Sequence, residues 1–230
     1  MTTCLSDVAA PSVARAARTV LLRAGVEVVV PRRQTCCGQP GWSAGLRDEA
    51  RAVARQALAV FAGDDPVVVP SGSCAAMVVH GYPELFAGRP EEEEAGAMAA
   101  RTMELSQFLL RHGLSPGARH AGSVTYHDSC HMLRILGERE SPRAALSGVD
   151  GLELLEMEQT EVCCGFGGTF ALSFPELSGA LGEQKARHAA ATGADELVAA
   201  DLSCLLHIVG RAHREGIPLR ARHLAEVLAG

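Results

Sequence analysis

The cysteines of this chain follow a spacing that occurs twice, and this repeat constrains the fold more than any other feature. The order is a single cysteine, an adjacent pair and a single cysteine, and each position recurs 126 to 130 residues later. The surroundings repeat too, since "VVVPSGSC" and "LVAADLSC" end at matching cysteines. We infer an internal duplication and predict two halves, residues 1–117 and 118–230. The eight positions are Cys4, Cys36, Cys37, Cys74, Cys130, Cys163, Cys164 and Cys204.

Strand and helix patterns alternate along each half. Short β-branched or apolar runs predict strands at 27–30, 66–70, 123–127 and 196–200, and apolar periodicity predicts helices at 43–62 and 177–191. Ser71 or Ser73 is a predicted cap for a helix that runs through Met77 and His80. Such βα units assemble into parallel sheets. The sequence therefore predicts an α/β fold of two duplicated Rossmann-like halves, related by a pseudo-two-fold axis, with the cysteines at the carboxyl ends of strands, where ligands bind.

Composition and charge restrict the function and the compartment. A net charge of −6 argues against a nucleic-acid partner, because phosphate-binding surfaces are usually basic. No apolar run is long enough for a membrane span, and residues 1–20 contain no signal-like apolar core, so we expect a cytoplasmic protein. Cytosolic thiols stay reduced, and a cysteine-rich cytosolic chain more often binds metal than forms disulfides.

The thiols have the number and kind of donors that an iron-sulfur cluster requires. Thiolates select iron-sulfur clusters, zinc or copper(I), and four of them commonly hold a four-iron cluster. We expect a [4Fe-4S] cluster in each half, with zinc as the alternative or adventitious occupant. Gly38 and Gly165 follow the cysteine pairs and let backbone N–H groups approach the centre. His127 and His131 flank Cys130 and are candidate hydrogen-bond donors to cluster sulfur, with direct ligation as a less favoured alternative.

With these motifs in place, the chain resembles the cysteine-rich CCG family over nearly its whole length. The family motifs are "TCCGQPGWSAGLRDEAR", "VVVPSGSCAAMV", "VTYHDSCHMLR", "EVCCGFGGTFAL" and "DLSCLLHIVGR". The family includes the B subunit of heterodisulfide reductase and the iron-sulfur subunit of glycolate oxidase. The resemblance, strongest to members that serve lactate utilization, implies an electron-transfer subunit of a complex that oxidises L-lactate to pyruvate. It also implies partner proteins, one with ferredoxin-type clusters, and cluster binding by all eight cysteines.

Two departures from the family pattern bear on these expectations. Ser71 and Asp201 stand where heterodisulfide reductase relatives have a further cysteine, so Asp201 is either an oxygen ligand of iron or a capping residue. Cys4 follows only three residues, which leaves no room for a full first strand. Two other functions stay open: a thiol/disulfide reductase-type subunit that uses the cysteines directly, and a zinc-bound structural scaffold for partners. Whether the chain is itself an enzyme is open too; we expect a non-catalytic or co-catalytic subunit.

Overall fold

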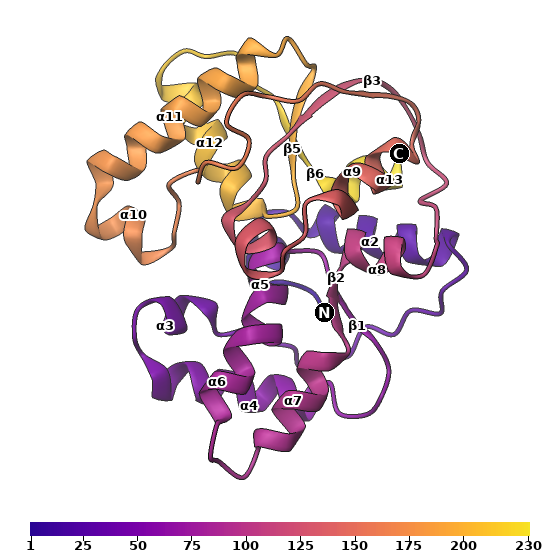
Figure 1. Ribbon diagram of the computed structural model, residues 1–230, viewed down its shortest axis with the longest axis vertical. Coiled ribbons are helices and arrows are strands. Elements are labelled where there is room, and N and C mark those ends of the chain that lie inside the picture. Colours follow the sequence, from indigo (N-terminus) through magenta and orange to yellow (C-terminus); the bar gives the residue numbers. More distant parts are fainter.

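The computed structural model describes residues 1–230 and shows an α/β protein in which every paired strand runs parallel to its neighbour (Figure 1). One sheet has the order β1-β2 and the other β4-β3-β5-β6. The predicted fold class is confirmed, whereas the pseudo-two-fold relation and the boundary after residue 117 stay predictions. The strands are β1 (Val67–Val69), β2 (Thr102–Glu104), β3 (Arg119–Tyr126), β4 (Asp150–Leu154), β5 (Glu196–Ala199) and β6 (Ala221–His223).

Helices follow most of the strands and cover the sheets. Two π-helical turns, Met77–Gly81 and His131–Ile135, interrupt the α-helical pattern, each a short distance after a cysteine. The α-helices are α1 (Cys4–Ala9), α2 (Pro11–Arg23), α3 (Gln39–Ser43), α4 (Arg47–Val60), α5 (Gly72–Ala76), α6 (Tyr82–Phe86), α7 (Glu92–Ala100), α8 (Leu105–Arg111), α9 (Glu140–Ser147), α10 (Thr169–Ser173), α11 (Pro175–Ala191), α12 (Leu202–Arg214) and α13 (Leu224–Ala229).

Most of the predicted elements are present. The apolar runs at 66–70, 123–127 and 196–200 coincide with β1, β3 and β5, and the predicted helices coincide with α4 and α11. Ser71 is the N-cap of α5, where its hydroxyl accepts a hydrogen bond from the Cys74 backbone N–H. The helix beyond this cap is not continuous, because the π-helical turn at 77–81 separates α5 from α6.

The predicted strand at 27–30 is wrong. Three of these four residues are valines, but the segment forms no ladder, and Val29 is 75% exposed. In the second half, the corresponding β4 pairs with β3. The first half has no strand in the place of β3: residues 1–3 form no ladder, although the Met1 amino group donates to the Val68 carbonyl at 2.7 Å and the Thr2 backbone N–H donates to the Gln34 side chain at 2.8 Å. Residues with a high β propensity form only an extended segment when no neighbouring strand is present to pair with them.

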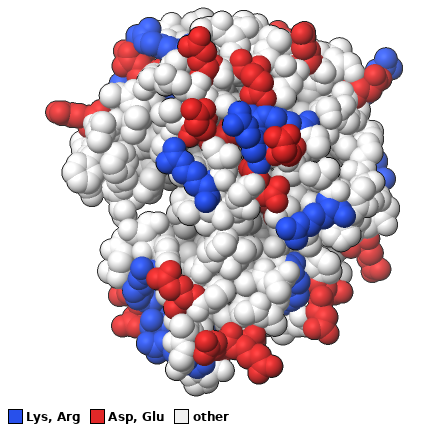
Figure 2. Space-filling model, in the orientation of Figure 1, with Lys and Arg blue, Asp and Glu red and all other residues white.

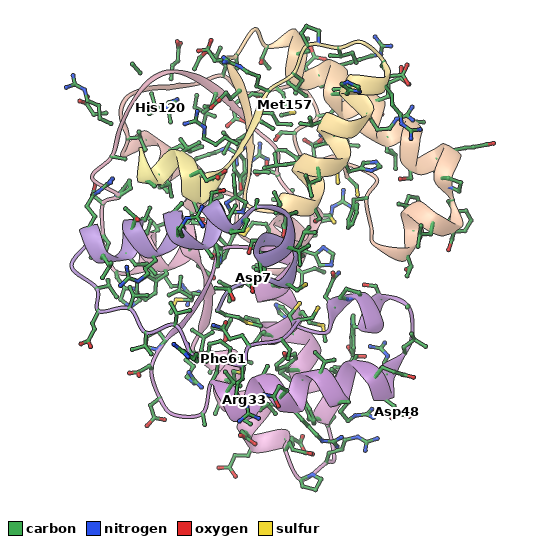
Figure 3. The ribbon with its side chains drawn as sticks, turned by 180° about the vertical axis from the view of Figure 1, so that it is seen from behind. Asp7, Arg33, Asp48, Phe61, His120 and Met157 are labelled. Carbon is green, nitrogen blue, oxygen red and sulfur yellow. The ribbon has the colours of Figure 1, made fainter.

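Three clusters of buried apolar side chains stabilise the fold. The largest, of 20 residues, draws on α2, α8, β3, α9 and α13 and thus on both predicted halves. In it, α2 lies against α13 and α8 lies against α9. The other two clusters lie around α4 and α6 and around α11 and α12. Phe61 and Met157 belong to these two clusters and mark the lower and upper parts of the molecule in Figure 3.

Charged side chains of both signs are interspersed over the surface. Figure 2 shows no broad face of a single sign, and the net charge is −6. A nucleic-acid surface would show a basic stripe or patch, so this face offers none. None of the helices combines the length and apolar character needed to cross a bilayer.

A buried carboxyl group ends β2 and begins α8. Glu104 accepts a hydrogen bond from the Ser106 backbone at 2.6 Å, and its other carboxyl oxygen has no partner. The side chain is fully buried. Burial raises the pKa of Glu104 to about 7, and the bonds from Ser106 and Gln107 offset this effect only in part. The folded protein thus holds a proton that the unfolded chain releases.

This carboxyl group predicts a pH-dependent stability. As the pH rises from the ordinary value of 4.5 to about 7, the free energy of unfolding should fall by about 3 kcal/mol and then level off, because only the unfolded state ionises freely over that range. Glu104→Gln, which cannot ionise, should remove the fall. Urea unfolding at several pH values measures it, with the exposed Glu49→Gln as the matched control. Equal slopes for Glu104→Gln and wild type would contradict the assignment.

Candidate metal centre

The four thiols of the first half meet although they come from three separate segments. Cys4 begins α1, Cys36 and Cys37 lie in the loop before α3, and Cys74 lies in α5. Thiol-to-thiol interactions join Cys36 to Cys4 and to Cys37, and join Cys37 to Cys74. Cys37 is 3% exposed, whereas Cys4 is exposed. The first thiol set, as we call these four cysteines, is therefore a continuous chain of sulfur atoms that is open at one end.

The four thiols of the second half repeat this order. Cys163 interacts with Cys130 and Cys164, and Cys164 interacts with Cys204. Cys130 follows β3, the adjacent pair lies in the loop before α10, and Cys204 lies in the first turn of α12. Cys164 and Cys204 are both buried, and all eight cysteines of the protein are free thiols. The second thiol set matches the first position by position.

Each set contains thiols that lose their protons easily. Interactions with Cys37 and Cys4 lower the pKa of Cys36, and interactions with Cys130 and Cys164 lower the pKa of Cys163. The pKa of Cys204 is lowered to about 7 by Cys164 and by the neighbouring imidazole, against the effect of burial. Because the thiolate is the form that binds metal, both sets offer ligands at neutral pH.

A glycine after each cysteine pair shapes the loop. Gly38 and Gly165 have φ values of 90° and 88°, in the left-handed region that favours glycine. Their backbone N–H groups donate to the sulfur atoms of Cys36 and Cys163 at 3.4 and 3.3 Å. A Cβ on Gly165 would lie only 2.6 Å from the Ser178 carbonyl oxygen. The glycines thus bring an N–H donor to the most acidic thiol of each set.

The first thiol set lines a cavity of about 190 Å³ between the halves. The second half supplies Phe166, Asp201, Leu202 and Ser203 to its wall. Phe166 belongs to the second CCG loop, so this loop reaches from one thiol set to the wall of the other site. The cavity is lined by Thr3, Cys4, Leu5, Val13, Cys36, Cys37, Gln39, Pro40, Pro70, Ser71, Ser73, Cys74, Phe166, Asp201, Leu202 and Ser203.

Asp201 connects the two halves beside this cavity. Its carboxylate is 2% exposed and accepts hydrogen bonds from the Ser71 hydroxyl at 2.8 Å and from the Ser73 backbone and hydroxyl at 2.9 and 2.7 Å. The other carboxylate oxygen accepts from Ser129, next to Cys130. Burial opposes ionisation, but the bonds from Ser129 and Ser73 outweigh it and hold the pKa of Asp201 below its ordinary value. Asp201 is the N-cap residue of α12, but its side chain makes no capping bond there and instead accepts the Ser73 backbone N–H in the first turn of α5.

The two histidines beside Cys130 have different surroundings. His131 lies with one ring nitrogen 3.5 Å from the Cys130 sulfur and the other 3.1 Å from the Gln39 side-chain nitrogen. His127 is fully buried, and neither of its ring nitrogens has a hydrogen-bond partner. Sequence reasoning did not single out Gln39, although its position two residues after the first cysteine pair is a signal that could have indicated it.

These observations test whether the protein fits a thiolate-bound metal or cluster. Each half links four thiols pairwise, and in the second half an unpartnered buried imidazole lies within 4.8 Å of two of them. Unpartnered buried polar atoms are rare in folded proteins unless a ligand satisfies them. The donor set is sulfur-rich, as iron-sulfur clusters and zinc require. The residues therefore fit the group that the cysteine pattern predicts.

An α/β protein with two matched sets of four free thiols has the donor groups that a thiolate-bound metal centre requires. Residues 1–79 and 124–209 match the family described as CCG, cysteine-rich domain. The chain therefore belongs to the CCG cysteine-rich family, which confirms the resemblance found in its motifs.

Similar proteins cover nearly the same length. Lactate utilization protein A of Geobacillus thermodenitrificans strain NG80-2 is 45% identical over 229 residues, which are 98% of this chain and 95% of the relative. Lactate utilization protein A of Halalkalibacterium halodurans is 46% identical over 230 residues, 98% of this chain and 93% of the relative. Lactate utilization protein A 2 of Bacillus cereus strain AH820 is 42% identical, over 99% of this chain and 95% of the relative.

Proposed function

We propose that this chain is a cytoplasmic iron-sulfur subunit that transfers electrons during the oxidation of L-lactate to pyruvate. The two thiol sets, linked in the same order in both halves, carry this proposal. The relatives named for lactate utilization supply the substrate. Bound clusters would accept and release single electrons. In this function the cysteines hold the clusters, and the N–H groups of Gly38 and Gly165 stabilise the thiolate charge.

The cavity at the first thiol set argues that lactate itself binds elsewhere. None of its lining residues is a lysine, arginine or histidine, and the wall includes the Asp201 carboxylate and the acidic Cys36 thiol. A lactate carboxylate would meet negative charge there and no cation to pair with. The first thiol set therefore offers no lactate site, and we assign the oxidation of lactate to a partner protein; a partner with ferredoxin-type clusters exchanges electrons with this chain.

The test is metal and sulfide analysis of the anaerobically purified or reconstituted protein. We expect iron and acid-labile sulfide in near-equal amounts, about four of each per thiol set, and an EPR signal on reduction. Lactate should reduce the protein only when the lactate-oxidising partner is present. Iron-free protein after reconstitution would overturn the proposal.

Two other outcomes would identify the alternative functions. Stoichiometric zinc without sulfide would indicate the structural scaffold, for which the nitrogen and sulfur donors at the second set are also suited. Metal-free protein in which oxidation reversibly lowers the number of reactive thiols would indicate the thiol/disulfide function. The acidic Cys36 and Cys163 thiols would serve that function.

A further inference from the structure

His127 is held in one place by the sheet. It directly follows β3, and its backbone N–H donates to the Val198 carbonyl at 2.9 Å, which continues the pairing of β3 with β5. The side chain is 0% exposed, and both ring nitrogens lack a hydrogen-bond partner. Burying an imidazole without any partner costs free energy that a folded protein rarely leaves unrecovered. The position therefore indicates a ligand that is not part of the polypeptide.

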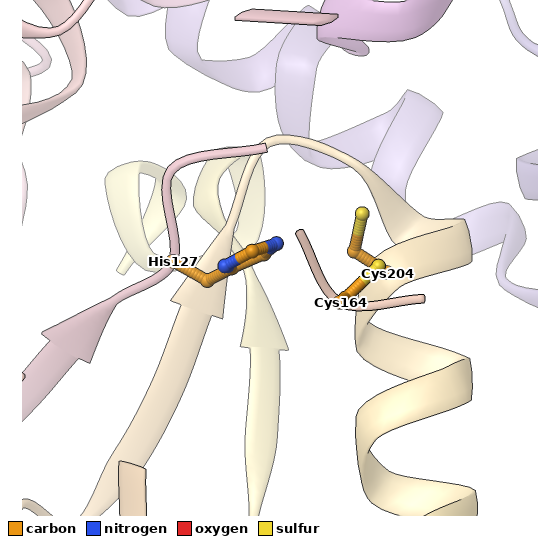
Figure 4. Close-up of side chains that lie close together, drawn as sticks. All are labelled: His127, Cys164 and Cys204. Atoms are coloured by element: carbon orange, nitrogen blue, oxygen red, sulfur yellow. The ribbon is translucent and has the colours of Figure 1, made fainter. Parts of the chain in front are cut away.

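The sulfur atoms of Cys164 and Cys204 lie beside this ring. A ring nitrogen of His127 and the two sulfur atoms all lie within 4.8 Å of one another. Figure 4 shows the ring pointing toward the two sulfur atoms, with the three side chains arriving from separate segments. Metal bonds to nitrogen and sulfur of about 2.0 to 2.3 Å place tetrahedral donors about 3.5 Å apart. The three donors are therefore close enough to one another to bind the same metal centre.

The other histidines near the thiols have different roles. His131 is already engaged by Gln39 and the Cys130 sulfur, and a ring nitrogen of His207 lies 3.1 Å from the Ser178 carbonyl oxygen. A ring nitrogen of His223 lies 2.8 Å from the Ala200 carbonyl oxygen. Among these four histidines, only His127 has two ring nitrogens without a geometric hydrogen-bond partner, and the polar groups beside its ring are the thiols of Cys164 and Cys204.

The first thiol set has no equivalent imidazole. In the duplicated sequence the position of His127 corresponds to Met1, because Cys130 corresponds to Cys4. The Met1 amino group donates to the Val68 carbonyl, and the cavity of the first set contains no histidine. The donors of the first site are therefore thiols alone, whereas those of the second site are thiols and an imidazole.

We propose that a ring nitrogen of His127 is a direct iron ligand at the second site. The proposal rests on the proposed function and adds a ligand to it. A neutral imidazole donates less negative charge to iron than a thiolate does, and histidine ligation raises the potential of a cluster. The two sites are therefore electronically unequal, and electrons placed in the protein occupy the second site before the first.

Pulsed EPR of the reduced wild-type protein tests the ligand without any substitution. Protein in which only histidine carries ¹⁵N should show a strong ¹⁵N hyperfine coupling, at the size of a directly bound nitrogen. The coupling should be lost in His127→Leu and retained in His131→Gln, the matched control from the same loop. A reductive titration followed by EPR should show two reduction steps, and the step at higher potential belongs to the second site. In His127→Cys this step should move toward the potential of the first site. His131→Gln should change it much less.

The outcomes separate this proposal from the proposed function. Full iron and sulfide content without a bound-nitrogen coupling, or with a coupling that survives His127→Leu, overturns the role of His127 and leaves the electron-transfer function standing. Two reduction steps that stay in place in a His127→Cys protein with full iron content overturn it as well. Protein without iron and sulfide overturns the proposed function itself.

Discussion

Cys164→Ser is expected to remove the iron of the second site and to leave the first site loaded, so that iron and sulfide fall to about half of the wild-type content. Cys164 is 2% exposed and interacts with both Cys163 and Cys204, so it is the inner link of its set. A serine hydroxyl is much less acidic than a cysteine thiol, and its oxygen is a harder donor than a thiolate sulfur, so it binds cluster iron poorly. Iron and sulfide analysis after anaerobic reconstitution, together with EPR, measures the result.

The matched control is Cys37→Ser, the same substitution at the corresponding position of the first thiol set. Cys37 occupies the corresponding place in the first set, is 3% exposed and interacts with Cys36 and Cys74. Cys37→Ser should therefore lose the other half of the iron and keep the EPR signal that Cys164→Ser loses. If both variants kept all the iron, the cysteines would not be the ligands. If both lost all of it, the sets would not be separate sites.

Asp201→Ala is expected to lower the free energy of unfolding by about 3 kcal/mol or more. The substitution leaves the hydroxyls of Ser71, Ser73 and Ser129 and one backbone N–H without their common acceptor in a buried junction. Hydrogen bonds to a charged group contribute about 1.5 to 3 kcal/mol each, and their losses do not add fully. Urea unfolding of the apo protein at neutral pH measures the difference.

Asp195→Ala is the matched control because Asp195 also accepts bonds from a serine backbone and hydroxyl, those of Ser123, but at an exposed site. It should lower the free energy of unfolding by less than about 1 kcal/mol. The pKa of Asp201 is depressed in the folded state, so its contribution is present at neutral pH and is lost only as the pH falls below the ordinary value of 3.8. Equal effects of the two substitutions would contradict the proposed role of Asp201 at the junction.

Much of the site could be predicted because cysteine spacing is a local property of the chain. The adjacent pairs, their glycines and the flanking strands β1, β3 and β5 are all readable from short windows of sequence. The duplicated spacing also predicted that matching thiols gather in matching places, and both sets show the same linked order. The strand predicted at 27–30 failed because a strand depends on a partner that lies elsewhere in the chain.

Interactions between the halves could not be predicted in this way. Asp201 reaches Ser71 across 130 positions, and Gln39 meets His131 across 92 positions. No periodicity or motif relates such residues, because their contact depends on how the sheets and helices are placed relative to one another. The packing of α2 on α13 and of α8 on α9 in the shared core could not be predicted for the same reason.

The amino-acid sequence by itself determined that the chain has two thiol sets, an α/β fold and a place in the CCG family. Only the tertiary structure decided that the first set opens into a cavity between the halves, that Asp201 joins them, and that His127 faces two sulfur atoms with no other partner. The physical reason is that each residue type carries its own donor chemistry. Which side chains are buried, which polar atoms find hydrogen-bond partners and which donors lie close together depend on how the whole chain packs.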